Sequence, residues 1–395
     1  MNCSRRLTDT LYWVGANDRR IALFENVYPV PRGVSYNSYL LLDEKTALFD
    51  TIDQAFTHQL LENVSSVLDG RSLDYLIVNH MEPDHCASIA DILFRYPGVK
   101  IVCTAKAANM MKQFFEFDVD QYVVPVKEGD TLSLGVHTLT FVMAPMVHWP
   151  EVMVTYETTE KILFSADAFG SFGAIDGNIF ADETDYKNQW LPEARRDYCN
   201  IVGKYGPQVQ ALLKKASGLE ISMICPLHSL VWRKDLDWLL EKYSRWSSYE
   251  PEEKTVLIAY ASVYGHTEQA ADAIAARLAE RGVPNIAVYD VSKTHPSYIR
   301  CSALVFASIT YNNGIFCNME TLLHQIAAHN LQNRTVAFLE NGSWAPVSVK
   351  HMTDTFASLK NMKVLEESLT IRSSLKNCQG DCLEALVDSI FQSLA

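Results

Sequence analysis

The sequence predicts two domains of the α+β and α/β classes: a strand and helix sandwich in residues 1–250, followed by an open, doubly wound parallel sheet in residues 254–395. Three observations support this division. The chain has 395 residues, which is longer than one hydrophobic core usually organises. A short polar segment that contains a proline, residues 247–254, is followed at once by a new strand pattern, as at a domain boundary. In both halves, apolar strand patterns end in loops of polar residues.

The composition narrows the classes of function. A formal net charge of -13, without any local run of lysine and arginine, argues against a nucleic-acid partner. The N-terminus lacks the apolar core of a secretory signal, and no later stretch is long enough to span a bilayer. The nine cysteines are scattered and odd in number, which favours reduced thiols. We therefore expect a soluble, cytoplasmic protein without membrane contact.

The first half alternates strand and helix patterns along the chain. We expect strands at residues 35–42, 46–51, 73–78, 99–103, 122–126, 138–143, 152–156, 161–165 and within 221–228, and helices at 55–68, 86–96 and 105–115. Polar residues follow strand 73–78 directly, and Pro83 stands among them. Because proline disrupts helix interiors, we expect Pro83 to prevent a regular helix and to leave an extended loop.

That loop carries residues of the types that bind metal ions. His80, Glu82 and Asp84 would converge from it, and three later strand ends contribute further candidates, namely His148, Asp167 and His228. A lone histidine or aspartate at a strand end is more often an ordinary hydrogen-bonded residue, and a solvated acidic loop is the simplest alternative. Four successive strand ends favour a dinuclear site instead. His80, Glu82 and His148 would serve one metal, Asp84 and His228 the other, and Asp167 would bridge them.

The second half places three polar loops after strand patterns at residues 255–261, 303–307 and 335–339, and a helix pattern at 268–280 follows the first loop. A hydroxyl-rich turn with a glycine before a helix N-terminus is suited to a phosphate group. Tyr311 or Trp344 alone would be ordinary exposed aromatics, but the three loops together indicate a ligand site. The candidate binding residues are Ser262, Val263, Tyr264, Gly265, His266, Thr267, Ser308, Thr310, Tyr311, Asn312, Asn313, Gly314, Asn341, Gly342, Ser343 and Trp344.

Both halves resemble a known family. The first, through its His-x-Glu-x-Asp loop and the three later candidates, resembles the diiron-binding, metallo-β-lactamase-like αββα sandwich of flavodiiron proteins. Hydrolases of that superfamily carry His-x-His-x-Asp-His, and Glu82 takes the place of the second histidine, which favours iron over zinc. His85 is a ligand in those hydrolases but in flavodiiron proteins is usually displaced or only weakly engaged, so we leave it outside the ligand set and its role open.

The second half resembles flavodoxin, which binds FMN. Tyr264 and His266 depart from the common first loop of flavodoxins, Thr-x-Thr-Gly-x-Thr, whereas Ser262, Gly265 and Thr267 keep its frame.

The resemblance implies FMN and two iron ions, and reduction of O2 to water, with reduction of NO to N2O as a second activity. It implies no catalytic residue beyond the metal ligands. It also implies a head-to-tail homodimer or dimer of dimers, the two-domain class, and a separate electron donor such as rubredoxin or reduced coenzyme F420. Two other functions stay open: a hydrolase of the metallo-β-lactamase superfamily with an accessory flavodoxin domain, and a non-enzymatic electron-transfer or sensor protein.

Overall fold

The computed structural model describes residues 2–395 and separates into two compact units. The first unit ends at Ser244, and the second begins at Arg245. The division falls within helix α8 (Leu236–Ser247), shortly before the polar segment at residues 247–254. That segment is shorter than expected, because strand β17 already begins at Glu253. Within residues 2–395, no helix is long and apolar enough to cross a membrane.

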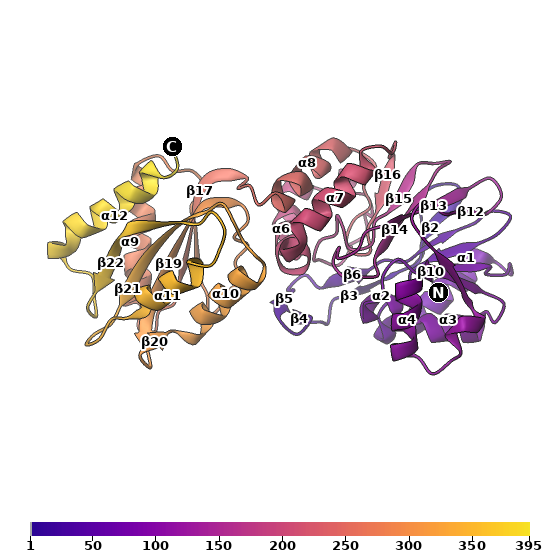
Figure 1. Cartoon of the computed structure of the whole chain (residues 1–395), viewed down its shortest axis with the longest axis horizontal. Helices are drawn as coiled ribbons and strands as arrows, with labels where there is room; N and C mark the ends of the chain where they lie inside the picture. The colour runs from indigo at the N-terminus through magenta and orange to yellow at the C-terminus, as the bar shows by residue number, and fades with distance from the viewer. Residues whose placement is uncertain (1) are drawn as a thin grey trace. The chain divides into compact units, whose positions relative to one another are not determined.

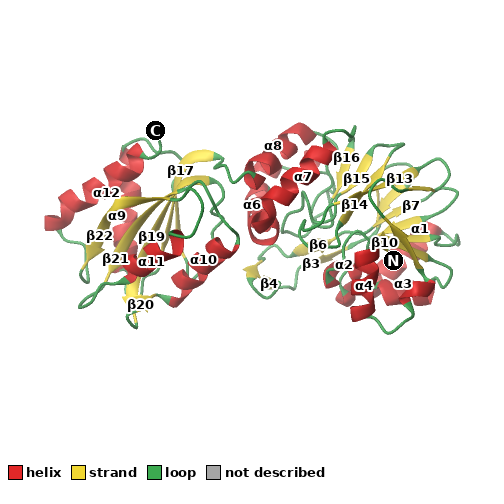
Figure 2. Ribbon diagram, viewed as in Figure 1, coloured by secondary structure: helices red, strands yellow, loops and turns green. Residues whose placement is uncertain are grey.

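The first unit contains two facing sheets (Figures 1 and 2). The seven-stranded sheet runs in the order β1 (Arg5–Arg6), β2 (Leu11–Trp13), β7 (Tyr39–Leu41), β8 (Ala47–Phe49), β9 (Tyr75–Ile77), β10 (Lys100–Thr104) and β11 (Val123–Val126). The five-stranded sheet runs β12 (Thr131–Ser133), β13 (Thr138–Met143), β14 (Met153–Glu157), β15 (Ile162–Phe164) and β16 (Met223–Cys225). Two small ribbons pair β3 (Ala16–Asp18) with β6 (Val34–Tyr36) and β4 (Leu23–Phe24) with β5 (Tyr28–Pro29).

Apolar side chains fill the space between the two sheets. Phe49 of β8 and Phe164 of β15 are both buried, and their rings stack with centroids 3.7 Å apart. Helices cover the outer faces, with α3 and α4 on one side and α7 and α8 on the other (Figure 1). The helices of this unit are α1 (Thr57–Leu68), α2 (Pro83–Cys86), α3 (Ile89–Arg95), α4 (Ala105–Phe114), α5 (Tyr186–Gln189), α6 (Leu191–Asp197), α7 (Gly206–Ala216) and α8. The expected αββα sandwich is confirmed.

The expectation that Pro83 prevents a regular helix was wrong. Pro83 is the first residue of α2, a position at which the missing backbone N–H would have no partner within the helix anyway. The single helix expected at residues 86–96 is therefore two helices, α2 and α3, which Ala87 and Ser88 separate. Pro83 still leaves the preceding residues extended, and Glu82, the N-cap of α2, has β-region dihedral angles.

The second unit is a doubly wound sheet in the order β18, β17, β19, β21, β22, and all neighbours along this path are parallel. Its strands are β17 (Glu253–Tyr260), β18 (Ala287–Asp290), β19 (Cys301–Tyr311), β20 (Gly314–Ile315), β21 (Thr335–Asn341) and β22 (Lys363–Ile371). Its helices are α9 (His266–Glu280), α10 (Cys317–Ala328), α11 (Ser348–Phe356) and α12 (Gly380–Gln392). Helix α9 packs beside α12, and α10 packs beside α11. The strand order reverses beside β17, which is where such sheets bind ligands.

Two strands of this unit are longer than the sequence suggested. β19 continues to Tyr311 and folds back through β20, so Ser308, Thr310 and Tyr311 lie on a strand and not in a loop. The reversal occurs at Asn312 and Asn313, which have φ angles of 48° and 59°, in a region that asparagine tolerates better than most residues. β21 likewise includes Asn341.

Candidate metal centre and ligand pocket

The loop after β9 is fixed to both sheets of the first unit. Asn79 follows the strand directly, and its side-chain oxygen accepts a hydrogen bond of 2.7 Å from the hydroxyl of Thr155 in β14. Met153, also in β14, donates its backbone N–H to the Asn79 carbonyl at 3.1 Å. His80 therefore begins from a backbone position that the packing of two sheets determines.

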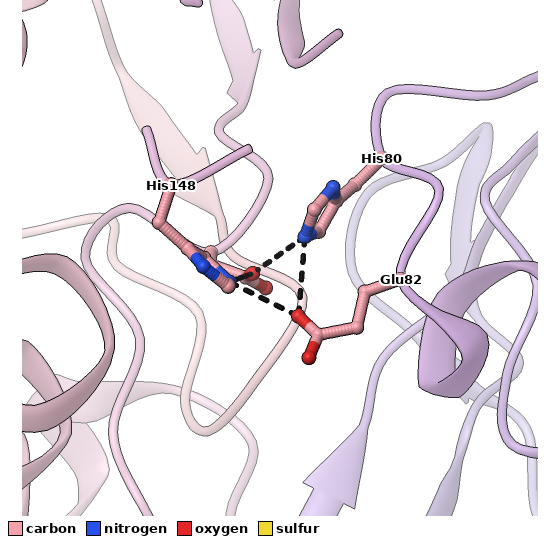
Figure 3. Close-up of side chains that lie close together, drawn as sticks. His80, Glu82 and His148 are labelled. Atoms are coloured by element: carbon pink, nitrogen blue, oxygen red, sulfur yellow. Dashed lines mark hydrogen bonds and ion pairs between the residues drawn. The ribbon is translucent and has the colours of Figure 1, made fainter. Parts of the chain in front are cut away.

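The first group of donor atoms comes from three separate loops (Figure 3). His148 Nε2 lies 3.0 Å from Glu82 Oε2, and His80 Nε2 lies 3.3 Å from the same oxygen. Asp167 Oδ2 lies 3.1 Å from each of these two ring nitrogens. Ligands bound at 2.0–2.2 Å to one ion are about 3 to 3.5 Å apart, so these four side chains have the spacing of a single metal site.

A second group lies beside the first and consists of Asp84, His85 and His228. Asp84 Oδ2 is 3.4 Å from the Nε2 atom of each histidine. The other oxygen of Asp167, Oδ1, lies 3.1 Å from His85 Nε2 and 3.7 Å from His228 Nε2. Asp167 thus directs one oxygen to each group, which is the geometry of a bridging carboxylate.

The polar atoms of these groups fit cations. Both oxygens of Asp84 and Oδ1 of Asp167 are buried and have no hydrogen-bond donor among the described residues. The Nε2 atoms of His85 and His228 lie only 3.1 Å apart. Two ring nitrogens that face each other stabilise the structure only if one donates a proton to the other or if both bind a third group. Buried oxygens without donors are costly, and a metal ion would satisfy them. The residues present therefore fit two metal ions.

The electrostatics of the cluster agree with this conclusion. Burial lowers the pKa of His148 and His228, but the neighbouring carboxylates outweigh burial and raise these pKa values to about 9 and about 10. Burial raises the pKa of Asp167, yet His80 and His85 hold that pKa well below its usual range. Without a metal, the site holds protons on its histidines to balance its carboxylates, and a bound cation would replace those protons.

The structure brings all six sequence-derived metal candidates together and adds two residues. His85, which the resemblance left outside the ligand set, lies in the second group. Glu151, which the sequence analysis did not consider, contacts His80 Nδ1 through its carboxylate at 2.8 Å. His85 follows Asp84 directly and takes the last place of the hydrolase pattern His-x-His-x-Asp-His, so that pattern could have indicated it. No local pattern marks Glu151, because its partner lies 71 residues earlier in the chain.

The second unit has a cavity of about 550 Å³ at the carboxyl ends of its strands. It is lined by Ser262, Val263, Tyr264, His266, Thr267, Ile309, Thr310, Tyr311, Asn312, Asn313, Asn341, Gly342, Ser343, Trp344, Ala345 and Ser373. Thirteen of these are sequence-derived candidates, and the cavity adds Ile309, Ala345 and Ser373. Its size is that of a site for a small organic cofactor.

Three candidates shape the cavity without lining it. Gly265 has a φ angle of +86°, caps helix α9, and donates its N–H to Ser262 Oγ at 3.0 Å. Ser308 is buried and turns its hydroxyl to the Ile309 carbonyl. Gly314 pairs with Tyr311 in the hairpin between β19 and β20.

Comparisons with known proteins identify both units. Residues 34–229 match the family model described as ODP family beta lactamase, and residues 257–383 match a flavodoxin domain. The chain is 32% identical to the anaerobic nitric oxide reductase flavorubredoxin of Aeromonas hydrophila, over 86% of this chain and 70% of the relative. It is 31% identical to the nitric oxide reductase of Moorella thermoacetica, over 93% of this chain and 92% of the relative.

Solved structures agree over the whole chain. The rubredoxin oxygen:oxidoreductase of Desulfovibrio gigas superposes with a TM-score of 0.92 at 27% identity, covering 99% of this chain and 98% of that one. The flavodiiron protein of Giardia intestinalis also has a TM-score of 0.92, at 25% identity, covering 100% and 96%. The flavodoxin domain and the clustered metal-binding side chains imply FMN and a diiron centre. This chain is an oxidoreductase and belongs to the flavodiiron protein family.

Proposed function

We propose that this protein reduces O2 to water at a diiron site in residues 1–250, with electrons that pass through FMN in residues 254–395. The observation that carries the proposal is the pair of donor groups that share Asp167, with a carboxylate, Glu82, where hydrolases of the superfamily have an imidazole. When bound, two ferrous ions and a reduced flavin together supply the four electrons that O2 reduction consumes.

The protein residues set the charge of the site. Glu82, Asp84 and Asp167 contribute three negative charges from buried positions, and the histidines become neutral when they bind metal. Hard anionic oxygen donors favour iron in both of its oxidation states over zinc, and they offset most of the charge of two divalent ions. This donor set argues against the hydrolase alternative. We include His85 as a further candidate ligand of the second ion, because its Nε2 atom lies within that donor group.

The FMN would occupy the cavity of the second unit. Its phosphate would lie at the N-terminus of α9, against Ser262 and Thr267, where backbone N–H groups and the helix dipole favour an anion. Tyr264 and Trp344, which are 88% and 86% exposed, would flank the flavin ring.

NO is the second candidate substrate, because relatives from Aeromonas hydrophila and Moorella thermoacetica are named nitric oxide reductases. As partners we propose a separate donor such as rubredoxin or reduced coenzyme F420, and a head-to-tail homodimer or dimer of dimers. The similarity to the rubredoxin oxygen:oxidoreductase of Desulfovibrio gigas supports a donor of the rubredoxin type.

The test is a metal and flavin analysis of the anaerobically purified protein, combined with measurement of O2 and NO consumption under one reductant, reduced rubredoxin. We expect two irons and one FMN per chain and consumption of O2. Preferred consumption of NO would assign the second substrate. Full occupancy by zinc, with hydrolysis of ester or lactam substrates and no reductase activity, would establish the hydrolase alternative.

A further inference from the structure

Glu151 reaches back from the loop after His148 to the loop that carries His80. Its side chain is fully buried, and Oε1 lies 2.8 Å from His80 Nδ1 and 2.9 Å from the backbone N–H of Met81. A carboxylate at neutral pH only accepts hydrogen bonds, so Nδ1 of His80 carries the proton. Nε2 is then the nitrogen with a free lone pair, and it is this atom that faces Glu82 and Asp167.

This contact distinguishes His80 from the other candidate histidines. His228 donates its Nδ1 proton to the backbone carbonyl of Ser35, a neutral acceptor, at 2.7 Å. His85 Nδ1 is buried and has no hydrogen-bond partner among residues 2–395. Among the four histidines of the two donor groups, only His80 has its Nδ1 hydrogen-bonded to a carboxylate in the described structure. The two donor groups therefore differ in the acceptor that their histidine Nδ1 atoms face, a carboxylate for His80 and a backbone carbonyl for His228.

A carboxylate that accepts the distal proton of a histidine fixes the ring and makes the other nitrogen a stronger base. A stronger donor stabilises the more highly charged state of the ion that it binds. Glu151 also adds a buried negative charge beside the first group, in a medium that screens charge poorly.

We propose that Glu151 is a positioning residue that orients His80 and, through its charge, makes the ion held by His80, Glu82 and His148 harder to reduce. This inference rests on the proposed diiron function. It assigns an asymmetry to the centre: one half has an anionic support behind a histidine, and the other has a neutral carbonyl.

The local structure allows charge to be separated from shape. The second oxygen of Glu151, Oε2, is buried and has no hydrogen-bond partner among the described residues. In Glu151→Gln, the amide oxygen would keep the bonds from His80 and Met81, and the NH2 group would take the position of Oε2, where no donor opposes it. Glu151→Gln thus removes the charge and keeps the contacts, whereas Glu151→Ala removes both.

Glu157 provides a matched control on the neighbouring strand β14. It is also a fully buried glutamate, and it accepts hydrogen bonds of 2.7 Å from the backbone N–H groups of Thr159 and Glu160. It contacts none of the metal candidates in the described structure. Glu157→Gln therefore tests whether neutralising any buried glutamate of this sheet produces the same effect.

The first experiment titrates the metal-free full-length chain with Zn²⁺. Because support of a ligand histidine typically contributes 10- to 100-fold to metal affinity, we expect about tenfold weaker binding in Glu151→Gln and about 100-fold in Glu151→Ala. Glu157→Gln should bind as the parent protein does. This result does not depend on iron or on turnover, so it separates a failure of this inference from a failure of the proposed function.

The second experiment measures the reduction potential of the iron-loaded protein by EPR-monitored titration. Glu151→Gln should retain both irons and raise the potential of one of them by about 59 mV, which is a tenfold change in the ratio of ferric to ferrous binding. If Glu151→Gln matches the parent protein in both Zn²⁺ affinity and potential, the charge has no role and the proposal fails. If Glu157→Gln causes equal changes, the effect is not specific to His80 and the proposal fails as well.

Discussion

The carboxylate of Asp50 accepts two hydrogen bonds from one residue, Asn79, whose backbone N–H and side-chain amide both lie 2.7 Å from it. The backbone N–H of His80 adds a third bond of 3.1 Å. Burial raises the pKa of Asp50 to about 6 even though these donors oppose the shift, so the carboxylate is charged at neutral pH. Asp50 thus holds the start of the ligand loop by accepting three hydrogen bonds from Asn79 and His80.

Asp50→Asn should displace that loop. One of the two new side-chain atoms would be an NH2 group that faces a donor of Asn79 or His80, and a buried donor without an acceptor costs about 1–3 kcal/mol. We expect a lower melting temperature and loss of iron from the first unit, with FMN content unchanged. Asp74→Asn is the control, because Asp74 lies at the other end of β9 and uses only one oxygen, to accept from Thr46. Equal iron content in the two variants would contradict the role of Asp50.

Glu82→His should shift the metal preference of the first group towards zinc. The substitution replaces the oxygen that lies 3.0 Å from His148 Nε2 with a neutral nitrogen donor, which lowers the negative charge that favours iron. After growth with equal iron and zinc, we expect the zinc to iron ratio to rise, together with loss of O2 reduction. Glu62→His, which makes the same change on the exposed face of α1, should leave both unaltered. A fully iron-loaded, active Glu82→His protein would refute the argument from charge.

Thr267→Ala should weaken FMN binding and leave the irons in place. Loss of one hydrogen bond to a charged phosphate corresponds to about a tenfold weaker Kd, to be measured by fluorescence titration of the flavin-free protein. Thr267 is buried, and its hydroxyl also accepts from Asn341 at 3.2 Å, so Thr267→Ser, which keeps the hydroxyl, should restore binding. Unchanged FMN affinity in Thr267→Ala would remove this residue from the proposed phosphate site.

The positions of the candidate ligands could be predicted from the sequence because strand patterns place side chains at known edges of a sheet. His148, Asp167 and His228 could be assigned to strand ends without knowledge of the fold, and the structure brings them together. Their contacts depend on tertiary packing, which local patterns do not encode. Glu151 shows this limit, because nothing near it in sequence indicates that it turns towards His80.

Two errors at the boundaries of elements have a similar cause. Pro83 was interpreted as a residue that prevents a helix, although proline at the first helical position is favourable. Three of the four residues 308–311 carry hydroxyl groups, which suggested a loop, but Ser308 and Ile309 pair with Glu340 and Asn341 of β21. Pairing with a neighbouring strand, and not composition, decides where such a segment ends.

The stability of the first unit should depend on pH through Asp43. Burial raises the pKa of this carboxyl, but the backbone N–H and the ring of His137 donate to it and lower the pKa from 3.8 to about 2. A carboxyl group whose pKa is lower in the folded protein than in the unfolded chain stabilises the folded state at pH values above its unfolded pKa. That contribution is lost as the pH falls from about 4 through 2. We expect Asp43→Asn to lower the free energy of unfolding by about 1–2 kcal/mol at pH 7, and the difference to shrink below pH 4.

Urea unfolding of the metal-free proteins at pH 7, 4 and 3 would measure this difference. Asp120→Asn is the control, because Asp120 pairs with Lys112 on the surface and its side chain is 72% exposed. A difference between the parent protein and Asp43→Asn that stays constant with pH would show that Asp43 acts through its shape and not its charge.

Asp167→Asn should separate the two halves of the metal centre. Oδ2 of Asp167 faces His80 and His148, and Oδ1 faces His85, so the native carboxylate offers one anionic oxygen to each group. Asparagine has one oxygen for both groups and would turn an NH2 group towards one of the cations, which repels it. We expect loss of at least one iron per chain and of O2 reduction, while the FMN spectrum is retained, because the second unit has its own core.

Asp84→Asn is the matched variant. Asp84 contacts only the second of the two donor groups, so this substitution should weaken binding of the second iron and leave binding of the first unchanged. Iron analysis with Mössbauer spectroscopy distinguishes a coupled pair from a single ion. Two coupled irons and near-native turnover in Asp167→Asn would show that Asp167 does not bridge, and that its contacts with the four histidines serve to hold the loop.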